Sequence, residues 1–181
     1  GVAYYRRAFP KMQFIRKLIQ EGALGEPVWA NIAAHSWFAP SGDDPKHWRV
    51  EPELSGGAGA LADIGVHRLD LLDYWLGEST LTSAVFTNLV HSYAVEDGSS
   101  LVLKLSSGAP VHAYFSWNSK TWIDRFEIVG SEGKIIAEPL DSGSLIVMRG
   151  RDREERDLPP PKNAHLPCVE DFLTACREGR E

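Results

Sequence analysis

Three side chains that can carry protons lie close together in an otherwise apolar stretch of the chain. They are Asp63, His67 and Asp70, within "ALADIGVHRLDLLDYWL". If this stretch is a helix, about 100° of rotation per residue places all three in one narrow stripe together with Tyr74. An imidazole titrates near neutral pH, and a carboxylate one turn away can hold it in a fixed orientation and tautomer. The spacing therefore fits a general acid–base pair of His67 and Asp63.

A purely structural explanation fits the same residues. Apolar side chains fill the opposite arc of the helix, which is the side that faces a core: Leu61, Ile64, Leu71, Leu72, Trp75 and Leu76. The stripe then faces water, where Asp63 and His67 form an ordinary i,i+4 pair. Arg68 falls inside the apolar arc and is expected to reach outward along its edge. The helix alone leaves both interpretations open.

A cluster of small residues precedes the helix. Gly56, Gly57 and Gly59 allow unusual backbone angles and the close approach of a ligand or another segment. They also bring the free N–H groups of the helix N-terminus beside the pair. A plain turn from loop to helix uses the same residues, so the cluster is weak support by itself.

The elements that must position these residues follow a simple order. Residues 1–7 are expected to be a short strand ending in two arginines, and Pro10 opens a helix that Gly22 follows. Residues 28–38 are strand-like. Residues 39–59 form a long polar loop rich in Pro and Gly, and structureless loops of this length are usually functional or disordered.

After the helix the pattern changes to consecutive strands. They are expected at residues 81–90, 99–107, 109–119, 124–130, 133–139 and 144–150. Short glycine-containing connections at 106–110 and 130–134 make neighbouring strands antiparallel. The charged segment 149–163 is expected to be a solvated edge and loop, and residues 166–179 a last helix. This order predicts an α+β fold, an open and mainly antiparallel sheet with helices packed on one face.

Composition limits the class of protein. The chain has 181 residues, of which 43% are hydrophobic and 24% charged, as in ordinary globular proteins. A net charge of -6 argues against nucleic acid as a partner. No apolar stretch is long enough to span a membrane, and no signal peptide is visible. Cys168 and Cys176 lie about two turns apart on one expected helix, too far for a disulfide. We therefore expect a reducing, cytoplasmic location.

The segment "WRVEPELSGGAGALADIGVHRLDLLDYWLGE" resembles the C-terminal domain of the glucose-fructose oxidoreductase / inositol dehydrogenase (Gfo/Idh/MocA) family. Those enzymes carry a glycine-rich turn followed by Asp-x-x-x-His-x-x-Asp on a helix. Other segments occur in the family's order: "YYRRAFP", "LIQEGALGEPVWA", "EIVGSEGKI" and "VEDFLTACREG". The chain departs from the common pattern at Ala58, which replaces the middle glycine of Gly-Gly-Gly.

The resemblance implies a dihydrodipicolinate-reductase-like domain of an NAD(P)-dependent oxidoreductase. Such enzymes oxidise a secondary alcohol of a sugar, polyol or related compound, or run the reverse reduction. His67 would then be the general acid/base, while Asp63 would orient it and contact the substrate. Asp70 would support the helix behind them. The same resemblance suggests that Arg6 contacts substrate. Trp48 and Arg49 are candidates to line the same pocket, and a loop anchor and a surface charge are the equally open alternative for these two residues.

What the sequence lacks also matters. No Gly-x-Gly-x-x-Gly lies between a strand and a helix, and the family's Glu-Lys-Pro motif has no equivalent. Residues 1–181 are therefore expected to be a C-terminal substrate-binding and oligomerisation domain without its N-terminal Rossmann domain. Alone, the chain should be inactive and bind NAD(P) weakly, with the stripe of Asp63 and His67 facing solvent. Family members dimerise through the open sheet face, so a homo-oligomer is expected.

Other classes remain to be weighed. The main alternative is a non-catalytic binding or dimerisation module with the same fold. A metal site is disfavoured because Asp63 and His67 supply only two ligands, without Cys-x-x-Cys or His-Glu-x-x-His. Hydrolase chemistry lacks the Gly-x-Ser-x-Gly turn. The particular substrate, the choice between NAD and NADP and the direction of reaction are not readable from these residues.

Overall fold

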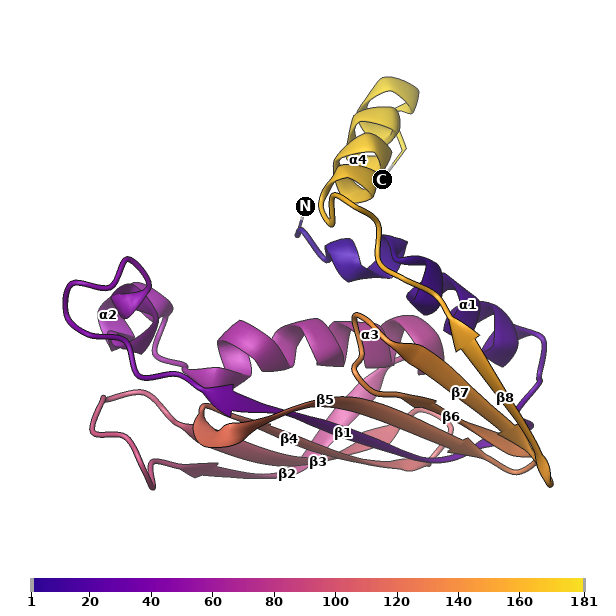
Figure 1. Cartoon of the computed structure of the whole chain (residues 1–181), viewed down its shortest axis with the longest axis horizontal. Coiled ribbons are helices and arrows are strands. Elements are labelled where there is room, and N and C mark those ends of the chain that lie inside the picture. Colours follow the sequence, from indigo (N-terminus) through magenta and orange to yellow (C-terminus); the bar gives the residue numbers. More distant parts are fainter. Residues whose placement is uncertain (1, 181) are drawn as a thin grey trace.

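The computed structural model describes residues 2–180, and one large sheet forms its base (Figure 1). The sheet has 8 strands in the order β2-β3-β4-β1-β5-β6-β7-β8. Their bounds are β1 (Pro27–Trp37), β2 (Ser79–Thr87), β3 (Gly98–Leu105), β4 (Pro110–Ser116), β5 (Asn118–Gly130), β6 (Gly133–Ala137), β7 (Ser144–Arg149) and β8 (Asp152–Asp157). The pair β1 and β4 is parallel, and the other neighbours are antiparallel. The predicted open, mainly antiparallel sheet is confirmed.

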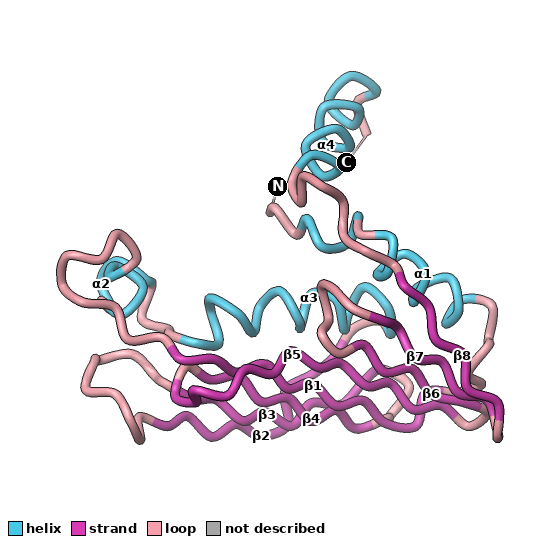
Figure 2. The backbone as a smooth tube through the Cα atoms, viewed as in Figure 1, coloured by secondary structure: helices cyan, strands magenta, loops and turns pink. Residues whose placement is uncertain are grey.

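Two helices lie along one face of this sheet, α1 (Pro10–Gln20) and α3 (Val66–Leu76) (Figure 1). A π-helical turn, η3 (Leu61–Gly65), runs directly into α3. Shorter helical turns are η1 (Tyr5–Ala8), η2 (His47–Val50) and α2 (Pro52–Ser55), and α4 (Leu166–Glu178) follows the sheet. The opposite face of the sheet carries no helix among the described residues (Figures 1 and 2).

The core lies between the sheet and these two helices. On β3, leucines 101, 103 and 105 are buried while the residues between them are exposed, so the strand alternates as a one-sided strand should. On α3, Leu71 and Leu72 are fully buried. Trp75 packs edge-on against Phe126 of β5 at 4.9 Å between ring centroids. The predicted apolar arc of the helix therefore does face the core.

The predicted N-terminal strand is wrong. Tyr5–Ala8 forms the 3₁₀ turn η1, in which the N–H groups of Arg7 and Phe9 donate to the carbonyls of Tyr4 and Arg6. A strand needs a neighbour to pair with, and the edges of the sheet are β2 and β8. Without a partner strand, this segment satisfies part of its backbone locally and packs on α3.

The two edges of the sheet differ in charge. The predicted solvated edge is confirmed at β8, although residues 152–157 are a strand rather than a loop. Its side chains carry charge throughout, and Arg153 pairs with Glu155 at 3.0 Å. The opposite edge, β2, contains no charged residue and exposes apolar side chains, namely Leu81, Val85 and Phe86.

The last helix does not cover the sheet as predicted. α4 projects away from the rest of the molecule on the helical side (Figures 1 and 2), and none of its residues is buried. Its contacts are with η1 rather than with a strand. The cover of the sheet is therefore α1 and α3.

Close packing at the start of α3 generates a test of the fold. A Cβ at Gly65 would lie 2.7 Å from Leu61 Cδ1 and 2.8 Å from Phe115 Cδ2. We expect Gly65→Ala to lower the free energy of unfolding by about 1–3 kcal/mol through overpacking, measured by urea denaturation. Gly42, with open space around it, is the matched control, and Gly42→Ala should change stability by less than about 0.5 kcal/mol. Equal stability of the two variants would contradict this packing.

Candidate functional site

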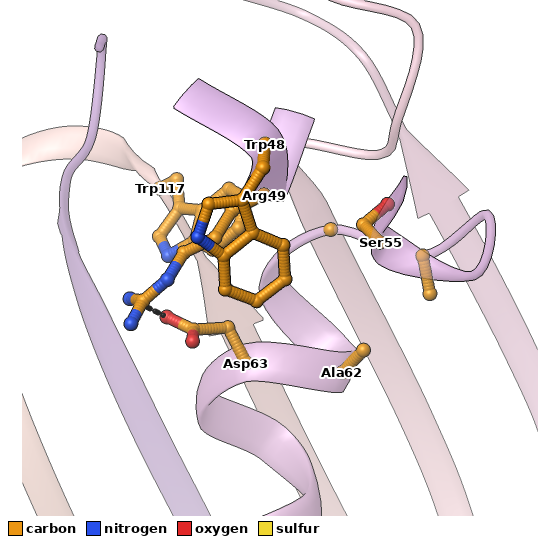
Figure 3. Close-up of a pocket in the computed structure, with 8 residues that line it drawn as sticks. Trp48, Arg49, Ser55, Ala62, Asp63 and Trp117 are labelled. Atoms are coloured by element: carbon orange, nitrogen blue, oxygen red, sulfur yellow. Dashed lines mark hydrogen bonds and ion pairs between the residues drawn. The ribbon is translucent and has the colours of Figure 1, made fainter. Parts of the chain in front are cut away.

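A small cavity of about 140 Å³ opens where the long loop meets the start of the helix (Figure 3). Its walls come from η2, α2, the glycine-rich turn, η3 and the link between β4 and β5. They are formed by Trp48, Arg49, Ser55, Ala58, Gly59, Ala62, Asp63 and Trp117. The predicted residues Trp48, Arg49 and Asp63 are thus brought together, whereas Arg6 and His67 lie outside this lining.

Asp63 is bound by an arginine instead of by the histidine. The Nη1 atom of Arg49 donates to Asp63 Oδ2 at 3.0 Å, beside the ring of Trp48 (Figure 3). Within residues 2–180 no hydrogen bond joins Asp63 to His67, so the predicted pair is wrong in this detail. The π-helical turn explains the difference, because its wider winding no longer stacks residues four apart as an α-helix does.

His67 is enclosed by the N-terminal segment. The ring of Tyr4 lies 6.0 Å away and that of Tyr5 lies 5.9 Å away, both edge-on, and His67 Nδ1 is buried without a hydrogen-bond partner. Arg7 Nε donates to Asp70 Oδ2 at 2.9 Å, and Asp70 is buried. The expectation that the stripe faces solvent is wrong, because η1 folds over it.

The surroundings of His67 favour the neutral imidazole. Burial lowers the pKa of His67, and the positive charges of Arg6 and Arg68 lower it further. Asp63 and Asp70 act in the opposite direction but do not reverse the net effect on this pKa. A neutral imidazole in this place can accept a proton from a hydroxyl group.

Two ion pairs, one partly buried and one buried, hold the arginines beside His67. Arg6 makes a bidentate contact with Asp141, with Nε–Oδ1 at 2.9 Å and Nη2–Oδ2 at 2.8 Å. Arg68 pairs with Asp124 of β5 at 2.9 Å and donates to the carbonyl of Ile64 at 3.0 Å. The prediction that Arg68 reaches outward is wrong, because Asp124 draws it onto the sheet. Burial raises the pKa of Asp124.

The glycine-rich turn holds a carboxylate of the protein itself. Glu96 accepts hydrogen bonds from the backbone N–H groups of Gly59 at 2.6 Å and Leu61 at 2.9 Å. A Cβ at Gly59 would lie 2.2 Å from the Glu96 carbonyl oxygen. These N–H groups are therefore occupied, and the turn does not fit the pyrophosphate of a dinucleotide.

Sequence reasoning missed several residues of the site. Glu96 lies in the connection from β2 to β3, beyond the strand that follows the helix, and no local pattern points to it. Ser55 Oγ and Arg49 Nε are buried without partners beside the cavity, and Trp117 forms part of its wall. The one available signal was position, since Ser55 directly precedes the glycine cluster.

Three further findings concern metal ligands, membrane-spanning helices and the two cysteines. Among residues 2–180, no group of three or more His, Cys, Asp or Glu is arranged to hold a metal ion. No helix in that range is both long and apolar enough to cross a membrane. Cys168 and Cys176 are free thiols.

Comparison with known proteins gives consistent matches. Residues 12–136 match the profile of the GFO/IDH/MocA C-terminal domain. The inositol 2-dehydrogenase of Rhizobium meliloti (strain 1021) is 27% identical, over 99% of this chain and 55% of its own length. The D-xylose 1-dehydrogenase (NADP(+)) of Haloarcula marismortui is 26% identical, over 76% of this chain and 39% of its own. A solved aldose-aldose oxidoreductase from Caulobacter crescentus, complexed with glycerol, has a TM-score of 0.85 and 25% identity, over 98% of this chain and 53% of that one. The chain thus spans about half the length of such relatives.

The carboxylate in the glycine-rich turn yields a prediction. Glu96→Gln should lower the free energy of unfolding by about 1–3 kcal/mol, because an amide cannot accept from both N–H groups with the strength of a carboxylate. Thermal and urea unfolding measure the change. The control is Glu53→Gln, at an exposed position of α2, where we expect almost no effect. Unchanged stability of the Glu96 variant would show that solvent replaces these bonds at no cost.

Proposed function

Because the chain belongs to the Gfo/Idh/MocA family as a C-terminal domain, we propose that it forms the substrate-binding and proton-transfer part of an NAD(P)-dependent oxidoreductase. Its substrate class is a secondary alcohol of a sugar, polyol or related compound. The observation that carries the proposal is the half-buried His67, whose pKa is lowered and which lies one turn after Asp63. Asp63 itself forms part of the wall of the small cavity. The printed names of its relatives, which include inositol and xylose dehydrogenases, support the substrate class.

Each side chain then has a distinct task. His67 accepts the hydroxyl proton when the alcohol is oxidised and returns it in the reverse direction. Asp63, oriented by Arg49 rather than by His67, contacts a substrate hydroxyl. The half-exposed ring of Trp48 offers a surface for the C–H face of a sugar. The unpartnered Ser55 Oγ and Arg49 Nε can form hydrogen bonds with substrate hydroxyl groups. Arg6 remains a candidate contact on the other side of His67.

The cofactor belongs to the proposal as well. NAD or NADP supplies hydride acceptance when it is bound. The described residues offer no cradle for its pyrophosphate, since Glu96 already occupies the glycine-rich turn. We therefore assign the dinucleotide to a Rossmann domain outside residues 1–181, and to this chain the substrate pocket and the proton acceptor.

The open sheet face is the proposed contact between two copies of the chain in a cytoplasmic enzyme. This face is divided: Val85, Val102 and Tyr114 are exposed over β2–β4, whereas Arg125 pairs with Glu127 over β5 at 2.7 Å. An exposed apolar face of this kind is usually covered by a partner, and a two-fold dimer is the commonest arrangement. The contact is therefore centred on β2–β4.

His67 gives the sharpest test of catalysis. In the complete oxidoreductase, His67→Gln should lower kcat by about a hundredfold or more, because the proton acceptor is lost while most of the side-chain volume between the tyrosine rings remains. Asp63→Asn should also lower kcat and raise KM. Steady-state kinetics with a panel of sugars and polyols measures both.

A matched control separates chemistry from packing. His165 packs against the same Tyr5 ring at 4.4 Å but belongs to the start of α4 rather than to the helix that carries Asp63. His165→Gln should leave kcat within about twofold of the parent. Normal turnover of the His67→Gln enzyme together with a lower melting temperature would support the alternative, a non-catalytic module with the same fold.

Assembly is tested by light scattering. We expect a dimer at high concentration, and Tyr114→Glu should shift it towards monomer because a carboxylate would be buried in the contact. Phe172→Glu on α4 is the control, since this residue is exposed away from the sheet. A monomeric parent chain, or dissociation by the Phe172 variant alone, would overturn the proposed contact.

A further inference from the structure

Two nearly buried arginines act on His67 from different elements. Arg6 comes from η1 and has a side chain that is 12% exposed, while Arg68 comes from α3 and is 8% exposed. Arg68 directly follows His67 in α3, and the Arg6 guanidinium lies 4.8 Å from the centroid of the Tyr5 ring, which is itself 5.9 Å from the His67 ring. Burial is the main cause of the lowered pKa of His67, and both guanidiniums lower this pKa further. Because burial excludes water, their effect is screened less than that of surface charges.

Each arginine is fixed in place by a carboxylate from the sheet side. Asp141, in the connection from β6 to β7, holds Arg6 in a bidentate contact, and Asp124 of β5 holds Arg68. The connection that carries Asp141 is itself fastened by the buried Lys11. Its Nζ donates to the carbonyls of Pro139 at 3.0 Å and Ser142 at 2.5 Å, on either side of Asp141.

The carboxylates that could stabilise a protonated His67 are already engaged. Asp63 is bound by Arg49 at 3.0 Å, and Asp70 is bound by Arg7 at 2.9 Å. The other titratable groups around the ring are Tyr4 and Tyr5 of the N-terminal segment, and His165 on the far side of Tyr5. Tyr4 and Tyr5 make T-shaped contacts with the imidazole and supply no carboxylate to it.

We propose that Arg6 and Arg68, anchored by Asp141 and Asp124, are positioning residues that keep the His67 imidazole unprotonated at neutral pH. The lowered pKa of His67 agrees with this arrangement. The consequence rests on the proposed function: the site is set to accept a hydroxyl proton, which is the direction of alcohol oxidation. Reduction would need the imidazolium and therefore a more acidic solution.

The test is an NMR titration of the histidine rings in the chain itself, without substrate or cofactor, with the His67 signals assigned by their loss in His67→Gln. Arg6→Gln removes a cation and should raise the pKa of His67 by roughly 0.5–1 unit. Arg6→Lys keeps the charge and should restore most of the shift. Arg68→Gln makes the same test from the other side. Asp141→Asn leaves Arg6 charged and should not raise this pKa.

Arg125→Gln is the matched control, because Arg125 forms a similar pair with Glu127 on the open sheet face. It should leave the titration of His67 unchanged. A His67 shift in Arg6→Gln and Arg68→Gln no larger than in this control, or an equal shift in Arg6→Lys, would overturn the inference.

The two proposals fail in different ways. In the complete enzyme, the acidic limb of kcat/KM for alcohol oxidation should move to higher pH in Arg6→Gln by the amount seen in the titration. Alcohol oxidation without any shift of this limb or of the titration would overturn the inference and leave the proposed function standing. If the titration of His67 shifts as expected but the complete protein oxidises no alcohol, the inference stands and the proposed function is overturned.

Discussion

The contact between Arg7 and Asp70 determines what the helix α3 faces. This pair fastens η1 across the helix, and one turn earlier the rings of Tyr4 and Tyr5 close over His67. The stripe of Asp63, His67 and Asp70 would face solvent on an isolated helix. Here it is covered by the N-terminal segment and lies in a small polar layer between that segment and the helix. The burial of His67, its unpartnered Nδ1 atom and the influence of Arg6 follow from the placement of this segment, which the Arg6–Asp141 pair also holds.

Arginine–aspartate pairs organise the whole neighbourhood of the helix. Besides the fastening pair, they are Arg6 with Asp141, Arg49 with Asp63 and Arg68 with Asp124. Arg68 and Asp124 are both buried, where a charge without a partner would cost several kcal/mol, so this pair fixes the place of both members. Each of these aspartates near His67 is paired with an arginine. His67 therefore has no carboxylate among these residues that is free to pair with it.

Local patterns predicted a large part of this architecture. Pro10 and the apolar spacing after it marked α1, glycine-containing connections marked the hairpins, and the cavity does gather Trp48, Arg49 and Asp63. The failures share a cause, which is distance along the chain. Arg6 lies 135 residues from Asp141, and Arg68 lies 56 residues from Asp124. Periodicity describes only residues that are close in sequence. It could therefore place Arg68 on a helix, but it could not predict that the carboxylate of Asp124 draws this side chain inward.

The unlike edges of the sheet bear on how the chain behaves in concentrated solution. Every side chain of β8 is charged and would lose water on pairing with another strand, which is a common protection against edge-to-edge growth. On β2 the backbone ladder is open, and its side chains are uncharged and include the exposed Leu81, Val85 and Phe86. We therefore expect intermolecular β-pairing, and with it aggregation during expression or refolding, to begin at β2. A single lysine placed outward in this strand is the simplest way to make the molecule more soluble.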